Sequence, residues 1–166
     1  MIKKLTACIL LTVMTVSSVA FAAIPAGHWF EGVAPEAASF YDAVNNEEFN
    51  PDDYLTYSKF ANVATNAIGR AIAYPTDKAD EFITRYDALS IICERMNYTY
   101  SLTDEEELAA AIAIADFNDM PQEYKQTALL SVNKGLIKGD ENGCVNMGEN
   151  LTYAEVLTIF VRAKQK

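Results

Sequence analysis

The chain has 166 residues, of which 51% are hydrophobic, and a formal net charge of −10 at pH 7. This length suits one domain with a modest core. The acidic balance argues against a nucleic-acid binder or a binder of anionic membranes, because both need clustered Lys and Arg side chains. With one histidine, His28, and no Cys/His cluster, the sequence predicts no zinc site.

The first element in chain order is an export signal. The pair Lys3-Lys4 precedes an apolar run from about residue 5 to 19, and Ala20-Phe21-Ala22 is a small-x-small cleavage site. We therefore predict a signal peptide over 1–22 and an exported mature chain that begins near Ala23, with a net charge of −12 after loss of the two lysines. Polar globular sequence follows, which disfavours a retained membrane anchor.

The cysteines leave two questions. The segment Leu5-Thr6-Ala7-Cys8 resembles a lipoprotein motif, but it precedes the apolar run instead of ending it, so lipidation is disfavoured. The mature chain keeps Cys93 and Cys144, and export permits a disulfide between them. Cys93 could equally be a small apolar core residue. The sequence leaves a bridge open.

A short phrase occurs three times, and each copy opens an apolar helical stretch. The copies are Leu55-Thr56-Tyr57-Ser58-Lys59, Ile83-Thr84-Arg85-Tyr86-Asp87 and Leu151-Thr152-Tyr153-Ala154-Glu155. Repetition favours a fold assembled from similar units and a repeated binding surface over a single catalytic centre. We predict two helix-loop-helix units, about 25–74 and 119–166, with a partial unit over 75–118 between them.

The phrase is suited to start a helix. Thr56, Thr84 and Thr152 are expected N-caps, whose hydroxyls accept a free backbone N–H of the first turn. Glu155 completes a capping box, and Asp87 is a shorter version of it. The three helices that follow have broad apolar faces, so we expect them to pack together as a central bundle.

The other predicted elements are less regular. Pro35 divides the stretch 29–44 into two short helices or a turn and a helix. A helix is expected over 103–115, where an acidic run complements the positive helix end more readily than it forms a metal site. Another begins at Met120-Pro121. The segment 139–143 is predicted to be a Gly/Asn turn, since it lacks the spacing of an EF-hand.

These residues support a family resemblance. The string Gly135-Leu136-Ile137-Lys138-Gly139-Asp140-Glu141-Asn142-Gly143, followed by Asn146 and the third phrase, resembles the S-layer homology (SLH) domain. Units of that family carry a G-I-I-x-G-x-x-D-G-x-F-x-P linker and an I-T-R-A-E helix start. Other pieces of the pattern are Phe49-Asn50-Pro51, Ile83-Thr84-Arg85 and Gly27-His28-Trp29. The resemblance covers about two and a half units, and the first is eroded.

The resemblance implies an all-α, pseudo-threefold helical bundle with a non-catalytic role. The family holds exported proteins on the bacterial surface by binding cell-wall polysaccharide, often a pyruvylated secondary polymer. Its motif arginine contacts the ligand, which assigns this role to Arg85, since a guanidinium fork matches a carboxylate. Tyr57 and Tyr153 replace that arginine in the other copies and can stack on a sugar without neutralising a carboxylate. Trp29 is a candidate sugar platform, and Gly139 allows close approach of a ligand.

Each assignment has an alternative in packing. Arg85 could be a solvated arginine near a helix start, and Trp29, Tyr57 and Tyr153 could be packing residues. No phosphate loop, G-x-S-x-G or H-E-x-x-H motif is present, so we predict no enzyme and no cofactor; a hydrolase with a carboxylate pair is the remaining catalytic alternative.

The predicted partners are therefore cell-wall polysaccharide and, as a further possibility, S-layer or other envelope proteins. The predicted location is extracellular, at the cell wall or cell surface. A second hypothesis is a degenerate SLH scaffold that acts through protein contacts or self-assembly without binding glycan. The two missing motif arginines favour it.

Overall fold

The computed structural model describes residues 24–46 and 48–165, so the predicted signal over 1–22 lies outside the described residues. Regular structure in these ranges is helical, with three isolated β-bridges, and the all-α prediction is confirmed. The α-helices are α1 (Ala34–Ala38), α2 (Tyr57–Ile68), α3 (Arg85–Arg95), α4 (Asp104–Ile112), α5 (Gln122–Asn133) and α6 (Tyr153–Lys164). No described helix has the length and apolar character needed to cross a membrane.

The three repeated phrases meet in a closed ring of backbone hydrogen bonds. The Leu55 N–H donates to the Leu151 carbonyl at 3.0 Å, the Ile83 N–H to the Leu55 carbonyl at 2.9 Å, and the Leu151 N–H to the Ile83 carbonyl at 3.1 Å. All three side chains are fully buried. The ring therefore joins segments that are far apart in the sequence at the end of the bundle where α2, α3 and α6 begin.

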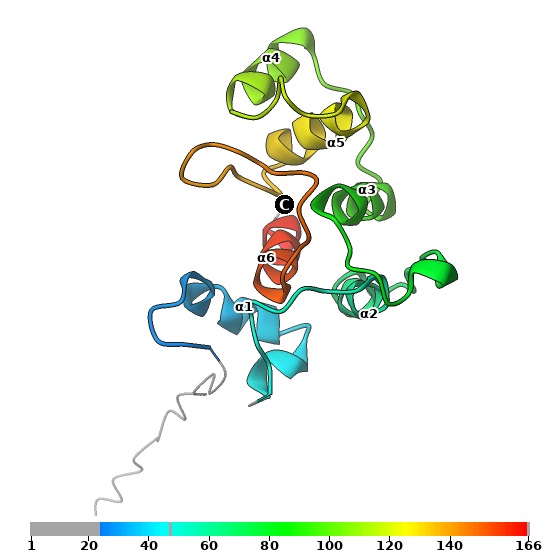
Figure 1. Ribbon diagram of the computed structural model, residues 1–166, viewed down its shortest axis with the longest axis vertical. Helices are drawn as coiled ribbons and strands as arrows, with labels where there is room; N and C mark the ends of the chain where they lie inside the picture. The colour runs from blue at the N-terminus through cyan, green and yellow to red at the C-terminus, as the bar shows by residue number, and fades with distance from the viewer. Residues whose placement is uncertain (1–23, 47, 166) are drawn as a thin grey trace, which may run out of the picture.

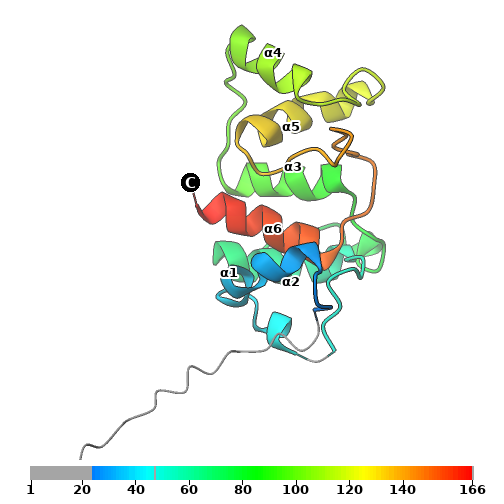
Figure 2. The same ribbon diagram turned by 90° about the vertical axis from the view of Figure 1, so that its left-hand side faces the viewer.

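Helices α2, α3 and α6 all begin at this ring and lie side by side (Figures 1 and 2). They run in the same direction, so their C-terminal ends gather at the opposite pole. Helix α6 is the most buried, with eight of its 12 residues in the core. Phe160 of α6 stacks on Phe60 of α2, with ring centroids 6.4 Å apart, and meets Phe40 edge-on. Aromatic packing thus fills the centre of the bundle.

The threonines of the phrases cap these helices. Thr56, Thr84 and Thr152 each accept the backbone N–H three residues later through their hydroxyls, at 3.2–3.4 Å. The Glu155 carboxylate accepts the Thr152 backbone N–H at 3.0 Å and completes a capping box. The Asp87 carboxylate instead accepts the Thr84 hydroxyl at 2.8 Å, because its side chain is one methylene shorter.

The preceding segments differ among the units. The Pro35 region is interrupted as predicted: the 3-10 helix η1 (Trp29–Gly32) is followed by α1, with the proline in its first turn, and by η2 (Asp42–Asn45). Only η3 (Thr76–Lys78) lies between α2 and α3. The helix predicted over 103–115 ends at Ile112 because the chain turns away there.

Two further features concern the chain between the helices. After α5, Gly135 takes a left-handed φ of 63°, which glycine adopts without strain. Cys93 is buried, Cys144 is half-buried, and both are free thiols. The disulfide that the sequence left open is therefore not formed in this structure.

Candidate functional site

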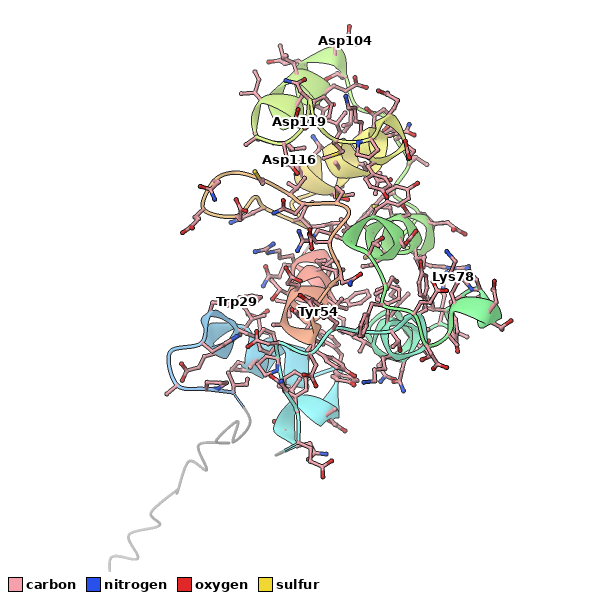
Figure 3. The ribbon with its side chains drawn as sticks, viewed as in Figure 1. Trp29, Tyr54, Lys78, Asp104, Asp116 and Asp119 are labelled. Carbon is pink, nitrogen blue, oxygen red and sulfur yellow. The ribbon has the colours of Figure 1, made fainter. Side chains whose placement is uncertain are left out.

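Three segments that are distant in the sequence converge on a cavity of about 670 Å³. The start of η1 contributes Trp29, the start of α3 contributes Arg85, and the loop before α6 contributes Gly139. Figure 3 shows Trp29 on the side of the molecule where the loop around residue 140 projects. We call this cavity the Trp29–Arg85 pocket. It brings together three of the five predicted ligand residues, whereas Tyr57 and Tyr153 do not line it.

Arg85 is held by contacts on both branches of its guanidinium. One branch donates to the carbonyls of Val145 and Asn146, and the other donates to the Glu155 carboxylate. The Arg85 side chain is only 14% exposed, and that of Glu155 is 31% exposed. Arg85 therefore ties α3, α6 and the loop before α6 together, and its positive charge is paired with Glu155 at the edge of the pocket.

Two aspartates fix the loop that forms one wall of the pocket. Asp116 accepts the backbone N–H groups of Val145 and Asn146 at 2.8 and 2.9 Å. Asp140 accepts those of Cys144 and Asn142 at 3.0 and 2.8 Å. These two bonds hold the pKa of the Asp140 carboxyl below its ordinary value, the one from Cys144 having the larger effect. The predicted Gly/Asn turn is thus a loop organised by carboxylates.

Gly139 has a structural reason to be glycine. A Cβ added there would lie 2.5 Å from the carbonyl carbon of Gly143, within the same loop. The backbone segments of this loop therefore pass too close for a side chain. Gly139 lines the pocket, and its lack of a side chain also lets the loop close on itself.

Trp29 presents an open aromatic surface to the pocket. Its side chain is 55% exposed, with His28 and Phe30 as ring neighbours. His28 Nδ1 accepts the Phe30 backbone N–H at 3.1 Å, and Nε2 donates to the Asp52 carboxylate at 3.1 Å. These bonds anchor the turn that carries Trp29, so the indole is displayed from a fixed backbone.

The two phrase tyrosines make their contacts within the fold. Tyr57 is 5% exposed, and its hydroxyl donates to the Asp87 carboxylate at 2.7 Å. Burial, and then that carboxylate, raise the pKa of Tyr57 well above its usual range. Tyr153 stacks on Tyr41 with ring centroids 6.0 Å apart and meets Phe49 edge-on at 5.5 Å. The structure therefore supports the packing alternative for both tyrosines.

Sequence reasoning missed two cations of the pocket. Lys138 lines it from the loop, and Arg162 lines it from α6 while donating to the Leu136 carbonyl at 3.2 Å. Burial lowers the pKa of the Arg162 guanidinium. Arg162 lies seven residues after Glu155, two helical turns along one face. That spacing was the signal that could have found it.

The positive and negative side chains that line the pocket balance in number. The cations are Arg85, Lys138 and Arg162, and the anions are Asp140, Glu141 and Glu155. A second cavity of about 420 Å³ is lined by the acids Asp116, Asp119 and Glu149 and suits an anionic ligand poorly. Among the described residues, no group of three or more His, Cys, Asp or Glu side chains could hold a metal ion.

Comparison of the chain with family models, with curated proteins and with solved structures gives no match. The likeness to the SLH family therefore rests on the residues of this chain. Its bearing on function is argued below from the Trp29–Arg85 pocket.

Proposed function

We propose that this protein is an exported, non-catalytic module of the SLH type that binds anionic polysaccharide of the bacterial cell wall and anchors at the cell surface. The observation that carries the proposal is the convergence of Trp29, Arg85 and Gly139 on one cavity. These residues come from separate segments and include the motif arginine and the aromatic opening of the unit.

The chemistry of the pocket suits an acidic sugar. An exposed indole face stacks on the apolar face of a pyranose, as aromatic side chains do on flat ligands. Lys138 can meet a carboxylate as a mobile point charge, and Arg85 can add the guanidinium N–H groups that Glu155 and the loop carbonyls do not use. Asp140 and Glu141 can accept sugar hydroxyls. The volume of about 670 Å³ falls in the range of small-ligand sites.

Cosedimentation with purified wall fragments tests the proposal. We expect wild-type protein to pellet with the wall and to stay in solution after hydrofluoric acid has stripped the secondary polymer. Trp29→Ala should lose most retention, since it removes the stacking face. Phe82→Ala is the matched control, because Phe82 is similarly exposed at 53% and does not line the pocket. No retention of wild type, or equal retention of the two variants, would refute the proposed site.

Arg85→Lys tests whether wall binding needs the shape of the guanidinium group or only its positive charge. Lysine keeps the positive charge but loses the fork that holds two carbonyls and Glu155 at once. We expect weaker wall retention with a folded circular-dichroism spectrum. Retention equal to wild type would show that Arg85 serves the fold alone.

A second candidate is a scaffold that acts through protein contacts without glycan. Leu108 and Ile112 favour it, because they lie one turn apart on α4 and are 62% and 76% exposed. This candidate predicts a concentration-dependent oligomer in sedimentation velocity that Leu108→Glu abolishes. A monomer at all concentrations would remove self-assembly as the explanation.

A further inference from the structure

The pole opposite the hydrogen-bonded ring contains a cavity of about 250 Å³. It is lined from the C-terminal ends of the three central helices, which Figure 2 shows gathered on the side where the chain ends. Arg70 follows α2, Arg95 ends α3, and Lys164 ends α6. We call it the pole pocket. It shares no lining residue with the Trp29–Arg85 pocket.

The charge of the pole pocket is unusual for this chain. Its charged lining residues are Arg70, Arg95 and Lys164, with no acid among them, in a protein of net charge −10. Within the described ranges, the ion pairs closer than 4.0 Å are His28–Asp52 and Arg85–Glu155, so none of these three cations is paired. Three uncompensated cations around one small cavity make a local positive potential.

Two of the cations are held in place. Lys164 Nζ lies 4.3 Å from the centroid of the Phe40 ring, which restrains its side chain through a cation–π contact. The Nε of Arg95 has almost no exposed surface and no hydrogen-bond partner among the described residues, so this part of the side chain is enclosed by the protein. An anion in the cavity would therefore meet Arg95 at its terminal guanidinium nitrogens. Asn97 adds a side-chain amide to the lining.

Compensation of helix dipoles explains only part of this arrangement. Cations are favoured in the last turn of a helix, where backbone carbonyls are free, and Arg95 and Lys164 lie in such turns. Arg70 lies beyond the end of α2, which Gly69 closes in a left-handed conformation. Dipole compensation also does not require the cations at the ends of three helices to line one cavity.

We propose that the pole pocket binds an oxyanion, a phosphate or carboxylate group, between Arg70, Arg95 and Lys164. Guanidinium and ammonium groups supply charge-assisted hydrogen bonds to such oxygens. The site is independent of the proposed wall-binding pocket. It also has the stronger positive charge of the two, because the charges of the Trp29–Arg85 pocket balance.

Titration followed by NMR tests this site directly. We would add inorganic phosphate, or pyruvate as the carboxylate probe, to 15N-labelled protein at constant ionic strength and follow the arginine Nε–Hε signals. We expect saturable shifts of the Arg70 and Arg95 signals with either probe, and none with added chloride. Absence of saturable shifts with both probes would overturn the proposal.

Two variants assign the shifts to the pole pocket. Arg70→Gln should weaken the affinity about tenfold, the effect of losing about 1.4 kcal/mol of binding; Arg70 is exposed, so the fold should be kept. Lys138→Gln, in the other pocket, is the matched control and should leave the affinity unchanged. Equal effects of the two variants would refute the assignment. Trp29→Ala changes the other pocket and should still bind phosphate in the pole pocket. The pole-pocket proposal can therefore hold even if the protein does not bind the cell wall.

Discussion

Removing the Glu155 carboxylate tests whether its contact with Arg85 stabilises the fold. The Glu155 side chain completes the capping box with Thr152 at 3.0 Å, and it also accepts from the Arg85 guanidinium. Helix α4 provides a matched control, since Thr103 and Glu106 form the same capping box at 2.7 Å with no arginine on the carboxylate in the described structure. The two boxes differ in the arginine and in exposure, since Glu106 is exposed and Glu155 is half-buried.

The expected loss follows from the contacts. Breaking the capping box of α6 costs about 1 kcal/mol. Loss of the charge-assisted bond to the mostly buried Arg85 adds about 2 kcal/mol, which is in the lower part of the range for hydrogen bonds to charged groups. The value is low because Glu155 is 31% exposed and because Arg85 keeps two carbonyl acceptors. Together these predict about 3 kcal/mol for Glu155→Ala, or a fall in Tm of about 6–12 °C for a domain of this size.

Urea and thermal unfolding followed by circular dichroism measure this difference. Glu155→Ala should lower Tm clearly more than Glu106→Ala, which loses a capping box and only the weaker influence of Asn133 and Lys134 at an exposed position. Glu155→Gln should fall between wild type and Glu155→Ala, because the amide oxygen still accepts a hydrogen bond without carrying charge. Equal losses for Glu155→Ala and Glu106→Ala would refute the reasoning, since the arginine contact would then contribute nothing beyond the cap.

Three other substitutions test the loop and the ring. Gly139→Ala should lower the free energy of unfolding in urea by about 1–3 kcal/mol, because the added Cβ would lie 2.5 Å from backbone. Gly32→Ala is the control, and it should change the free energy of unfolding by less than about 0.5 kcal/mol because nothing lies near that Cβ. Asp140 stabilises the fold above its ordinary pKa of 3.8, and this contribution is lost as pH falls through its lower folded-state pKa. Asp140→Asn should therefore flatten Tm against pH between about 5 and 2, and an unchanged slope would contradict the assignment. Tyr57→Phe should cost about 1 kcal/mol through loss of the 2.7 Å bond to Asp87, and no loss would show that the bond is neutral.

The parts of the fold that depend on local signals could be predicted from the sequence. The caps at Thr84 and Thr152 and the apolar faces behind them need only the helical period and an N-cap hydroxyl. The ring and the pole pocket depend on how distant segments meet. No spacing in the sequence places Arg70 beside Lys164, since the pairing follows from three helices ending at one pole.

The candidate site shows the same limit. Tyr57, Arg85 and Tyr153 hold the same position in the three phrases, and this equivalence made all three candidate ligand residues, with packing as the alternative for each. In the structure each faces a different interface, and only Arg85 lines the Trp29–Arg85 pocket. The contacts of each repeated position depend on the residues packed around it, and a repeat within one sequence does not specify those residues.

The ring also gives a rule for these contacts and an exception to it. The third residue of one phrase bonds the fifth residue of the next: Tyr57 donates to Asp87, and Arg85 donates to Glu155. Continued around the ring, Tyr153 would meet the fifth residue of the first phrase.

That residue is Lys59, which has no acceptor for a phenol and is exposed. Tyr153 instead packs against Tyr41 and Phe49, in the segment before the first phrase. The lysine and the tyrosine therefore both differ from the SLH pattern that the sequence resembles, and Tyr153 makes aromatic contacts where the other two phrases make a polar one. If wall binding needs an arginine paired with an acid at this place in the ring, only the interface between α3 and α6 retains it.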